Sequence, residues 1–179
     1  MSSITGLASS VYTMEYLSDG TLATGGSDRN VTIWNLTSGA KLVIFCQFPN
    51  TIYAIKEISP QVIAIGGIAS NVSFYRVNSS MTPVLIKSIP FSSGFVSNSM
   101  VVATVPYGSI NSTILYVGCY TGYANVFNVT DVNNISILAP VKIDIGGSIL
   151  YSVEKSSKKL IIFLKCVFLK LSGVEYSRK

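Results

Sequence analysis

The sequence contains no histidine, the side chain that most often acts as a general base in enzymes. Catalytic arrangements of the Ser-His-Asp and Cys-His kinds therefore cannot be built within this chain. Its eight carboxylates show no spacing that would pair them as an acid and a base, and most are expected at turns or on solvent-facing strand positions. We predict that the chain is not an enzyme.

Cysteine is also scarce, because Cys46, Cys119 and Cys166 are few, odd in number and far apart. This spacing argues against a disulfide framework and against a zinc site. We expect buried apolar thiols in a reducing compartment. Neither a metal nor a cofactor is predicted.

Charged residues make up only 12 % of the chain, and the excess of positive charge lies at one end. Residues 1–153 carry six basic and six acidic side chains, whereas residues 154–179 carry seven basic and two acidic ones. A basic surface over a whole domain, as nucleic-acid binding requires, is therefore not predicted. Three interpretations of the basic tail at 155–179 stay open: a degraded repeat, a surface for anionic partners, or residues following a truncated gene model.

Long apolar runs are missing, and a helix needs about 20 apolar residues to span a bilayer. The longest block, "LIIFLKCVFLKL" at 160–171, is shorter and contains two lysines. The N-terminus has neither the basic start nor the apolar stretch of a signal peptide. We therefore predict a cytoplasmic protein, with the nucleus as the alternative, and attribute the seven Asn-x-Ser/Thr sequons to composition rather than to glycosylation.

Hydrophobic residues nevertheless make up 49 % of the chain and occur in short runs separated by Gly, Pro, Asn and Ser. Such runs favour strands joined by turns, so an all-β fold is predicted. These runs also repeat, since "LATGGSDRNVTIWNL" at 22–36 aligns with "IAIGGIASNVSFYRV" at 63–77. The same offset of 41 residues aligns "VYTMEYLSDG" at 11–20 with "IYAIKEISPQ" at 52–61.

A third copy is "LYVGCYTGYANVFNV" at 115–129, where Gly118 aligns with Gly66 and Phe127 with Tyr75 at an offset of 52. We attribute the 11 additional residues to a turn-rich insertion around "PYGSINS" at 106–112. A fourth copy begins with "LYSVEKSSKKLIIF" at 150–163 and then loses the pattern, because Leu164 and Lys165 replace the glycine pair.

Each copy is interpreted as four short strands, which in the first copy cover 11–17, 21–27, 31–36 and 42–48. The turn "SDG" at 18–20 joins the first two strands, and its glycine is expected at positive φ. A period near 40 residues with four strands per unit is typical of β-propeller blades. Gly25 and Gly26 are then expected where backbones approach closely, and a phosphate-binding loop is disfavoured because a strand, not a helix, follows them.

The stretch "SSVYTMEYLSDGTLATGGSDRNVTIWNLTSGAKL" at 9–42 resembles a WD40 repeat. The resemblance covers residues 9–145, and 148–163 weakly. It implies a eukaryotic protein whose fold is an incomplete ring of three to four four-stranded antiparallel blades. Residues 1–147 would form blades at about 9–48, 50–90 and 94–145, and residues 148–179 a degenerate or truncated fourth blade with the basic tail.

In that family a strand hydroxyl, a turn aspartate and a tryptophan join a histidine in a structural hydrogen-bond network. Carried over, its members here are Thr24, Asp28 and Trp34, and the network is incomplete without a histidine. Ala69 and Thr121 stand at the aspartate position of the next two copies. The structural candidates implied by the resemblance are Thr24, Gly25, Gly26, Asp28, Trp34, Gly66, Gly67, Tyr75, Gly118 and Phe127.

The resemblance also implies a non-catalytic scaffold that holds other proteins or peptides on its rim and loops, with no small-molecule substrate. The loops expected to supply affinity are "TSGAK" at 37–41, "SSMTP" at 79–83 and "PYGSINS". An incomplete ring exposes strand edges, so we expect a fragment of a longer propeller or a chain that needs a partner. The alternatives are a regulatory or targeting segment of a larger catalytic protein and a truncated gene product without function.

Overall fold

The computed structural model describes residues 9–45, 48–78, 81–90, 97–107, 110–119, 123–138, 141–142, 150–156, 159–164 and 167–170. These residues form strands joined by turns and loops, so the predicted all-β fold is confirmed. Within the described part of the chain, no helix is long and apolar enough to cross a membrane. The strands assemble into four antiparallel sheets, numbered here in chain order.

Sheets 1 and 2 each contain four strands in sequence order. The strands of sheet 1 are β1 (Val11–Tyr16), β2 (Thr21–Gly26), β3 (Val31–Asn35) and β4 (Lys41–Phe45). Those of sheet 2 are β5 (Ile52–Ser59), β6 (Val62–Gly67), β7 (Asn71–Asn78) and β8 (Met81–Pro90). The first copy thus has the four predicted strands, each slightly shorter than expected.

Sheet 3 has a split outer strand, because two short strands pair with different parts of β11. Its strands are β9 (Ser97–Tyr107), β10 (Ile110–Cys119), β11 (Tyr123–Asn128), β12 (Ser136–Ile137) and β13 (Val141–Lys142). Sheet 4 is three-stranded and consists of β14 (Leu150–Ser156), β15 (Lys159–Leu164) and β16 (Val167–Lys170).

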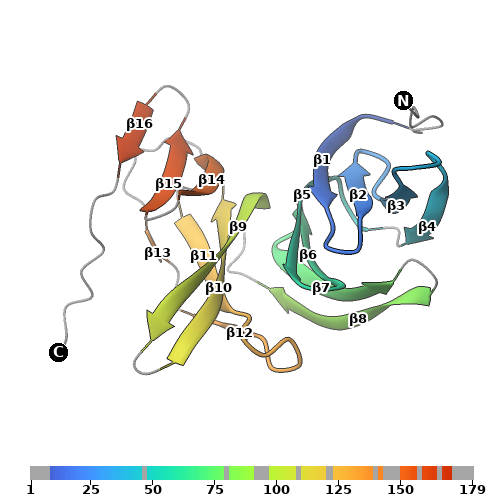
Figure 1. Ribbon diagram of the computed structural model, residues 1–179. Helices are drawn as coiled ribbons and strands as arrows, with labels where there is room; N and C mark the ends of the chain where they lie inside the picture. The colour runs from blue at the N-terminus through green and yellow to red at the C-terminus, as the bar shows by residue number, and fades with distance from the viewer. Residues whose placement is uncertain are drawn as a thin grey trace.

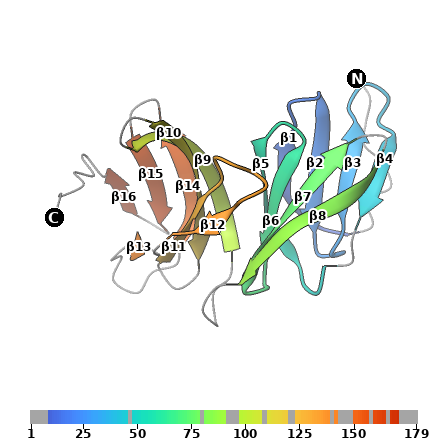
Figure 2. The ribbon, with the colours of Figure 1, turned by 90° about the horizontal axis from the view of Figure 1, so that it is seen from below.

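The four sheets lie in an open arc, with sheet 1 at one end and sheet 4 at the other (Figures 1 and 2). The first strand of each sheet lies nearest the middle, since β1 contacts β5, β5 contacts β9, and β9 contacts β14. The later strands of each sheet lie farther out (Figure 1). This is the arrangement of propeller blades around an axis, without closure of the ring.

The sequence repeat is reproduced in the hydrogen-bonded register. Met14 lies opposite Thr24 in sheet 1, and the residues 41 positions later, Ile55 and Ile65, lie opposite each other in sheet 2. The turn before β2 also has the expected geometry, because Gly20 has φ 84° and its N–H donates to the Leu17 carbonyl at 3.0 Å. The first three strands of sheets 1 and 2 are therefore equivalent position by position, whereas the outer strands β4 and β8 differ in length and register.

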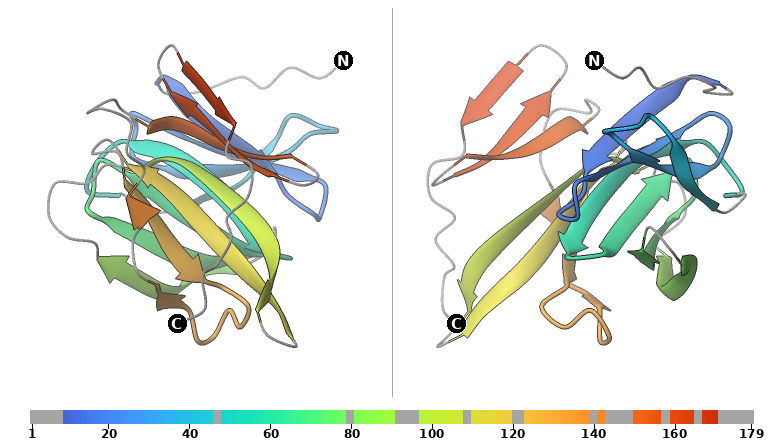
Figure 3. Two further views of the ribbon diagram at one scale, coloured as in Figure 1. Left: turned by 90° about the vertical axis from the view of Figure 1, so that its left-hand side faces the viewer. Right: turned by 45° about the vertical axis from the view of Figure 1, so that its right-hand side comes forward.

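The "PYGSINS" segment differs from the expectation of a turn-rich insertion. Residues 106–107 end β9 and residues 110–112 begin β10, so the insertion lengthens a hairpin, while 108 and 109 lie outside the described residues. Pro106 fits there because β9 is an edge strand of its sheet and needs no ladder hydrogen bond on its outer side. Figure 3 shows this long hairpin reaching past the shorter strands of its neighbours.

Two hydrophobic clusters fill the spaces between the first three sheets. Successive residues of β6 point into different clusters, because Ile63 and Ile65 join sheet 1 whereas Val62 and Ala64 join sheet 3. This explains why β6 is buried along its whole length instead of alternating. The principal partners are Ala23, Val31, Ile33 and Phe45 on one side and Leu115, Val117 and Phe127 on the other.

Side chains of β1 form hydrogen bonds with the free edge of β5. This is the edge opposite β6, where sheet 2 has no further strand. The Ile55 N–H donates to Thr13 Oγ1 at 3.2 Å, and the Glu57 N–H donates to Glu15 Oε1 at 3.2 Å. Glu15 also forms an ion pair with Lys56 at 2.8 Å. Polar side chains thus cover an edge that would otherwise offer unpaired backbone groups to other chains.

Candidate interaction surface

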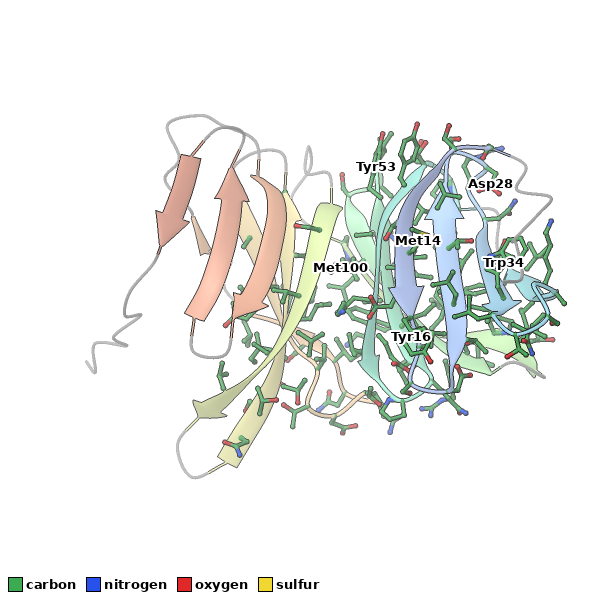
Figure 4. The ribbon with its side chains drawn as sticks, turned by 45° about the horizontal axis from the view of Figure 1, so that its top comes forward. Met14, Tyr16, Asp28, Trp34, Tyr53 and Met100 are labelled. Carbon is green, nitrogen blue, oxygen red and sulfur yellow. The ribbon has the colours of Figure 1, made fainter. Side chains whose placement is uncertain are left out.

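The antiparallel order of the strands sorts the connections onto two ends of the molecule. One end, called end A, carries the β1–β2, β3–β4, β5–β6, β7–β8 and β9–β10 connections. The other, called end B, carries the β2–β3 and β6–β7 connections and the starts of β1 and β5. Figure 4 shows Asp28 and Tyr53 at end B and Tyr16 toward end A. All three loops expected to bind partners therefore belong to end A.

The turns of sheet 1 at end A are held by Asp and Asn side chains. Asp19 Oδ1 accepts hydrogen bonds from the N–H of Thr21 at 3.0 Å and from its hydroxyl at 2.6 Å. Asn35 Oδ1 accepts from the N–H groups of Thr37 at 2.9 Å and Ser38 at 3.1 Å. Asn35, the residue after the tryptophan, thus fixes the "TSGAK" turn by Asx-type bonds.

Sheet 3 fixes its corresponding connection in the same way. Asn128 Oδ1 accepts from the Thr130 N–H at 3.0 Å, and Asp131 Oδ1 accepts from the Asn133 N–H at 2.9 Å. The Thr130 hydroxyl in turn accepts from the Thr113 N–H at 2.9 Å. The connection after β11 is therefore shaped by its own side chains before any partner binds.

Glu57 joins the turns of sheets 1 and 2 at end A. Its carboxylate accepts from the N–H and the hydroxyl of Ser18, both at 2.8 Å, and from the Gln61 N–H at 3.1 Å. These bonds connect the β1–β2 turn to the β5–β6 turn. Sequence reasoning missed Glu57, because nothing near it in the chain indicates a partner 39 residues away.

Sheets 2 and 3 are joined by two basic side chains of sheet 2, one on β7 and one on β8. Lys87 Nζ donates to the Ile135 carbonyl at 2.7 Å, and an Arg76 guanidinium nitrogen donates to Asn133 Oδ1 at 3.4 Å. Both acceptors belong to the connection after β11. Strands β7 and β8 of sheet 2 are thus connected to the β11–β12 connection of sheet 3.

End B carries an aromatic pair that sequence reasoning also missed. The rings of Tyr12 and Tyr53 lie 5.2 Å apart at an interplanar angle of 42°. The two tyrosines are separated by the repeat offset of 41, which is the signal that could have found them. Asp28, at the same end, accepts from the Asn30 N–H within its own turn at 3.3 Å.

The structure places Thr24, Asp28 and Trp34 around one small cavity of about 80 Å³. Trp34 Nε1 donates to Thr24 Oγ1 at 2.8 Å, and the Thr24 hydroxyl is 3.5 Å from the Thr32 carbonyl oxygen. Lys41 Nζ lies 5.4 Å from the centroid of the buried Trp34 ring. Thr24 and Trp34 are therefore bonded directly, whereas Asp28 accepts the N–H of Asn30 in its own turn.

Tyr75 and Phe127, at the tryptophan position of the next two copies, lie at the interfaces between sheets. The Tyr75 ring is 5.4 Å from that of Phe45 and 5.9 Å from that of Phe48. The Phe127 ring meets Phe74 edge-on at 5.8 Å. Each ring thus contacts an aromatic residue that precedes its own sheet in the chain.

Three of the candidate glycines lie where other atoms come too close to leave room for a Cβ, and these atoms are of two kinds. A Cβ on Gly25 would come within 2.7 Å of Ile52 Cγ2, a side chain of the neighbouring sheet. A Cβ on Gly26 or Gly67 would overlap the backbone carbonyl just before the first strand of the same sheet. Gly66 and Gly118 lie in β6 and β10 opposite Val72 and Ala124.

The described residues contain no group of three or more Cys, Asp or Glu side chains placed to hold a metal ion. Cys119 is a free buried thiol, and Cys46 and Cys166 lie outside the described residues. Burial raises the pKa of the Cys119 thiol, and hydrogen bonds from Asn125 oppose part of this rise. A raised pKa keeps the thiol protonated, and the thiol is a weaker nucleophile than the thiolate.

No family model and no curated protein matches the sequence. Solved structures do resemble the fold. The C-terminal WD40 domain of Sif2 matches with a TM-score of 0.70 at 12 % identity, covering 94 % of this chain and 48 % of that chain. U3-55K also gives a TM-score of 0.70 at 12 % identity over 89 % of this chain and 47 % of its own.

The matched chains fall into two length classes. The chain spans about half the length of the Sif2 and U3-55K structures. By contrast, the computationally designed Ika4 protein is of similar length, with a TM-score of 0.67 at 12 % identity over 95 % of this chain and 96 % of that chain.

Proposed function

From its WD40-type β-propeller fold, we propose that this chain is a non-catalytic scaffold that binds proteins or peptides through end A. One observation carries the proposal: Asp and Asn side chains fix turns of sheets 1 and 3 at this end, and Glu57 holds the β5–β6 turn of sheet 2. Hydrogen bonds of Glu57, Lys87 and Arg76 link the three sheets. A surface shaped before binding loses little conformational entropy on association.

In this proposal the "TSGAK", "SSMTP" and "PYGSINS" segments supply the partner contacts, although residues 79–80 and 108–109 lie outside the described residues. The blades follow the limits proposed from the sequence, at 9–48, 50–90 and 94–145, with a last unit at 148–179. The protein acts in the cytoplasm, with the nucleus as the alternative. If the chain is part of a longer protein, this scaffold is the regulatory or targeting part of it.

Photo-crosslinking tests the proposal. A benzophenone amino acid placed at Ser38 or at Asn133, both exposed at end A, should attach covalently to the same cellular protein. The matched control is Ser88, an exposed serine of the outer strand β8, which should give no such adduct. Equal labelling from Ser88, or different proteins from the two end-A positions, would show that end A is not a binding surface.

A further inference from the structure

The face of sheet 1 that points away from sheet 2 carries exposed apolar side chains that the proposed scaffold function does not use. The strand register places Met14, Tyr16 and Ile44 on this face, together with the buried pair of Thr24 and Trp34. The three apolar side chains are 66, 64 and 57 % exposed, respectively. We call Met14, Tyr16 and Ile44 the N-terminal face; Figure 4 labels two of them.

The same repeat position is covered in the next two sheets. Ile55, which follows Met14 by 41 residues and has the same register, is only 4 % exposed because sheet 1 packs on it. Met100 holds this position in sheet 3 and packs against the core between sheets 2 and 3. An apolar side chain at this position is therefore covered wherever another sheet precedes its own.

The surface that covers this position is the apolar face of the preceding sheet. Ile55 is covered by the opposite face of sheet 1, through residues such as Ala23, Val31 and Ile33. Sheet 2 offers its equivalent face to sheet 3, and sheet 3 borders sheet 4 through the contacts of β9 and β10 with β14. Among the described residues, sheet 4 is the one whose equivalent face meets no following sheet.

The sequence of sheet 4 also indicates burial on both sides. Its central strand β15 reads "KLIIFL", in which five apolar residues follow one another without alternation. Such continuous runs are typical of strands buried on both faces, whereas a strand with one solvated face alternates. Sheet 3 accounts for one side of sheet 4, which leaves the other side for a further sheet.

We propose that the N-terminal face of one chain packs on sheet 4 of a second copy, and that two such contacts close one ring of two chains. Two copies supply eight sheets, within the range of closed propellers. They also match the solved WD40 chains, of which this chain covers about half. Each end of one arc thereby meets the complementary end of the other.

Charge favours this head-to-tail pairing over contact between two copies of the same end. Residues 150–170 contain five lysines and one glutamate, so two sheets 4 in contact would bring like charges together. Residues 11–45 contain three acidic and two basic side chains, so sheet 1 carries a small excess of negative charge. The pairing of sheet 1 with sheet 4 therefore joins opposite net charges.

Sedimentation equilibrium of the purified 179-residue chain gives the first test. We expect the mass of two 19.2 kDa chains, and we expect Met14→Arg to weaken the dimer at least tenfold, since it places a cation against the lysine-rich sheet. Val84→Arg is the control, because Val84 is 58 % exposed on the outer strand β8 and should leave the dimer intact. Circular dichroism melting of both variants verifies that they fold. A monomeric wild type, or a Met14→Arg dimer as tight as the control, would overturn the proposal.

Crosslinking gives the second test and fixes the orientation. A benzophenone amino acid at Met14, in a mixture of ordinary and isotopically labelled chains, should react with residues 150–170 of the other chain. Adducts to residues 11–45 of the other chain, or assemblies that grow beyond two chains, would overturn the head-to-tail closed ring. Binding through end A is measured separately at Ser38, so failure of one proposal does not affect the other.

Discussion

The first three strands of sheets 1 and 2 share one register, yet equivalent side chains meet different surroundings. Sheet 2 lies between two sheets and is buried on both faces of β6, whereas sheet 1 has one neighbouring sheet among the described residues. Trp34 accordingly bonds Thr24 within its own sheet, and its equivalent Tyr75 packs on Phe45 of the neighbour.

The difference shows that the repeat specifies the strands, while the neighbouring sheet determines whether a position holds a polar or an apolar side chain. Where a sheet precedes, the position of Thr24 is occupied by an apolar residue, Ile65 in sheet 2 and Val117 in sheet 3. Both of these are buried in the clusters between sheets. Among sheets 1 to 3, a hydroxyl therefore occupies this position in sheet 1, where it accepts the Trp34 N–H within the same sheet.

The largest effect on stability is expected from substitutions at equivalent positions of sheets 1 and 2. Ile55→Ala should lower the free energy of unfolding by about 2–5 kcal/mol, because it opens a cavity between sheets 1 and 2. Met14→Ala should change the stability of the single chain by about 0.5 kcal/mol or less, because Met14 is largely exposed. Denaturant unfolding at low protein concentration, where any dimer has dissociated, measures both.

The paired variants carry their own control, since the two positions have the same register in equivalent strands. Equal losses from Ile55→Ala and Met14→Ala at low concentration would mean that the environments of sheets 1 and 2 do not differ. A loss from Met14→Ala that grows with protein concentration would instead follow from the proposed dimer, because association then adds to stability.

The fold could be predicted from the sequence wherever the repeat kept its register. The offset of 41 aligned the glycine pairs, and the hydrogen-bonded pairs of sheets 1 and 2 follow the same offset. The "PYGSINS" segment could not be predicted, because residues such as Tyr107 and Ile110 suit a longer hairpin as well as a loop. The partner strand decides between them, and the local sequence does not contain that information.

The candidate surface was harder to predict than the fold. The resemblance placed Thr24, Asp28 and Trp34 together, and the structure shows a bond between two of them and a shared cavity for all three. Glu57 could not have been found, because its bonds to Ser18 depend on how two sheets pack. Contacts of this kind come from the assembly of repeats and not from any single repeat.

A smaller effect is expected at the buried hydrogen bond of sheet 1. Thr24→Val should lower the free energy of unfolding by about 1–3 kcal/mol, because the Trp34 N–H loses its acceptor inside the protein. The double variant Thr24→Val with Trp34→Phe copies the Val117 and Phe127 pair of sheet 3. In the Trp34→Phe background the Thr24→Val step should cost at least about 1 kcal/mol less, since no donor is left unpaired.

Urea unfolding of the wild type, the two single variants and the double variant gives a double-mutant cycle. The cycle isolates the coupling free energy between Thr24 and Trp34. Additive losses from the two substitutions would show that the bond contributes nothing beyond the packing of each side chain. The same cycle at Ile65 and Tyr75 of sheet 2 has no equivalent bond between a threonine hydroxyl and an indole, so its coupling should be smaller.

The smallest effect is expected in sheet 3, where the polar pair of Cys119 and Asn125 depends on pH. Asn125 Nδ2 donates to Cys119 Sγ at 3.1 Å, and burial raises the pKa of this thiol above that of the unfolded chain. Below the unfolded pKa of about 8.5 both states keep the proton, so the thiol does not affect the pH dependence of stability. Above it the unfolded chain loses the proton first, so the free energy of unfolding falls as pH rises.

Comparison with Cys119→Ala isolates this thiol, because every other ionisable group is present in both chains. Between pH 8 and pH 10 the wild type should lose stability faster than Cys119→Ala, and the gap should stop widening once the folded thiol ionises as well. Urea unfolding at each pH measures the gap. Parallel stability curves for the two chains would mean that the thiol ionises equally in the folded and unfolded states. The pair of Cys119 and Asn125 in sheet 3 would then not differ in pH dependence from the pair of Thr24 and Trp34 in sheet 1, which contains no titrating group.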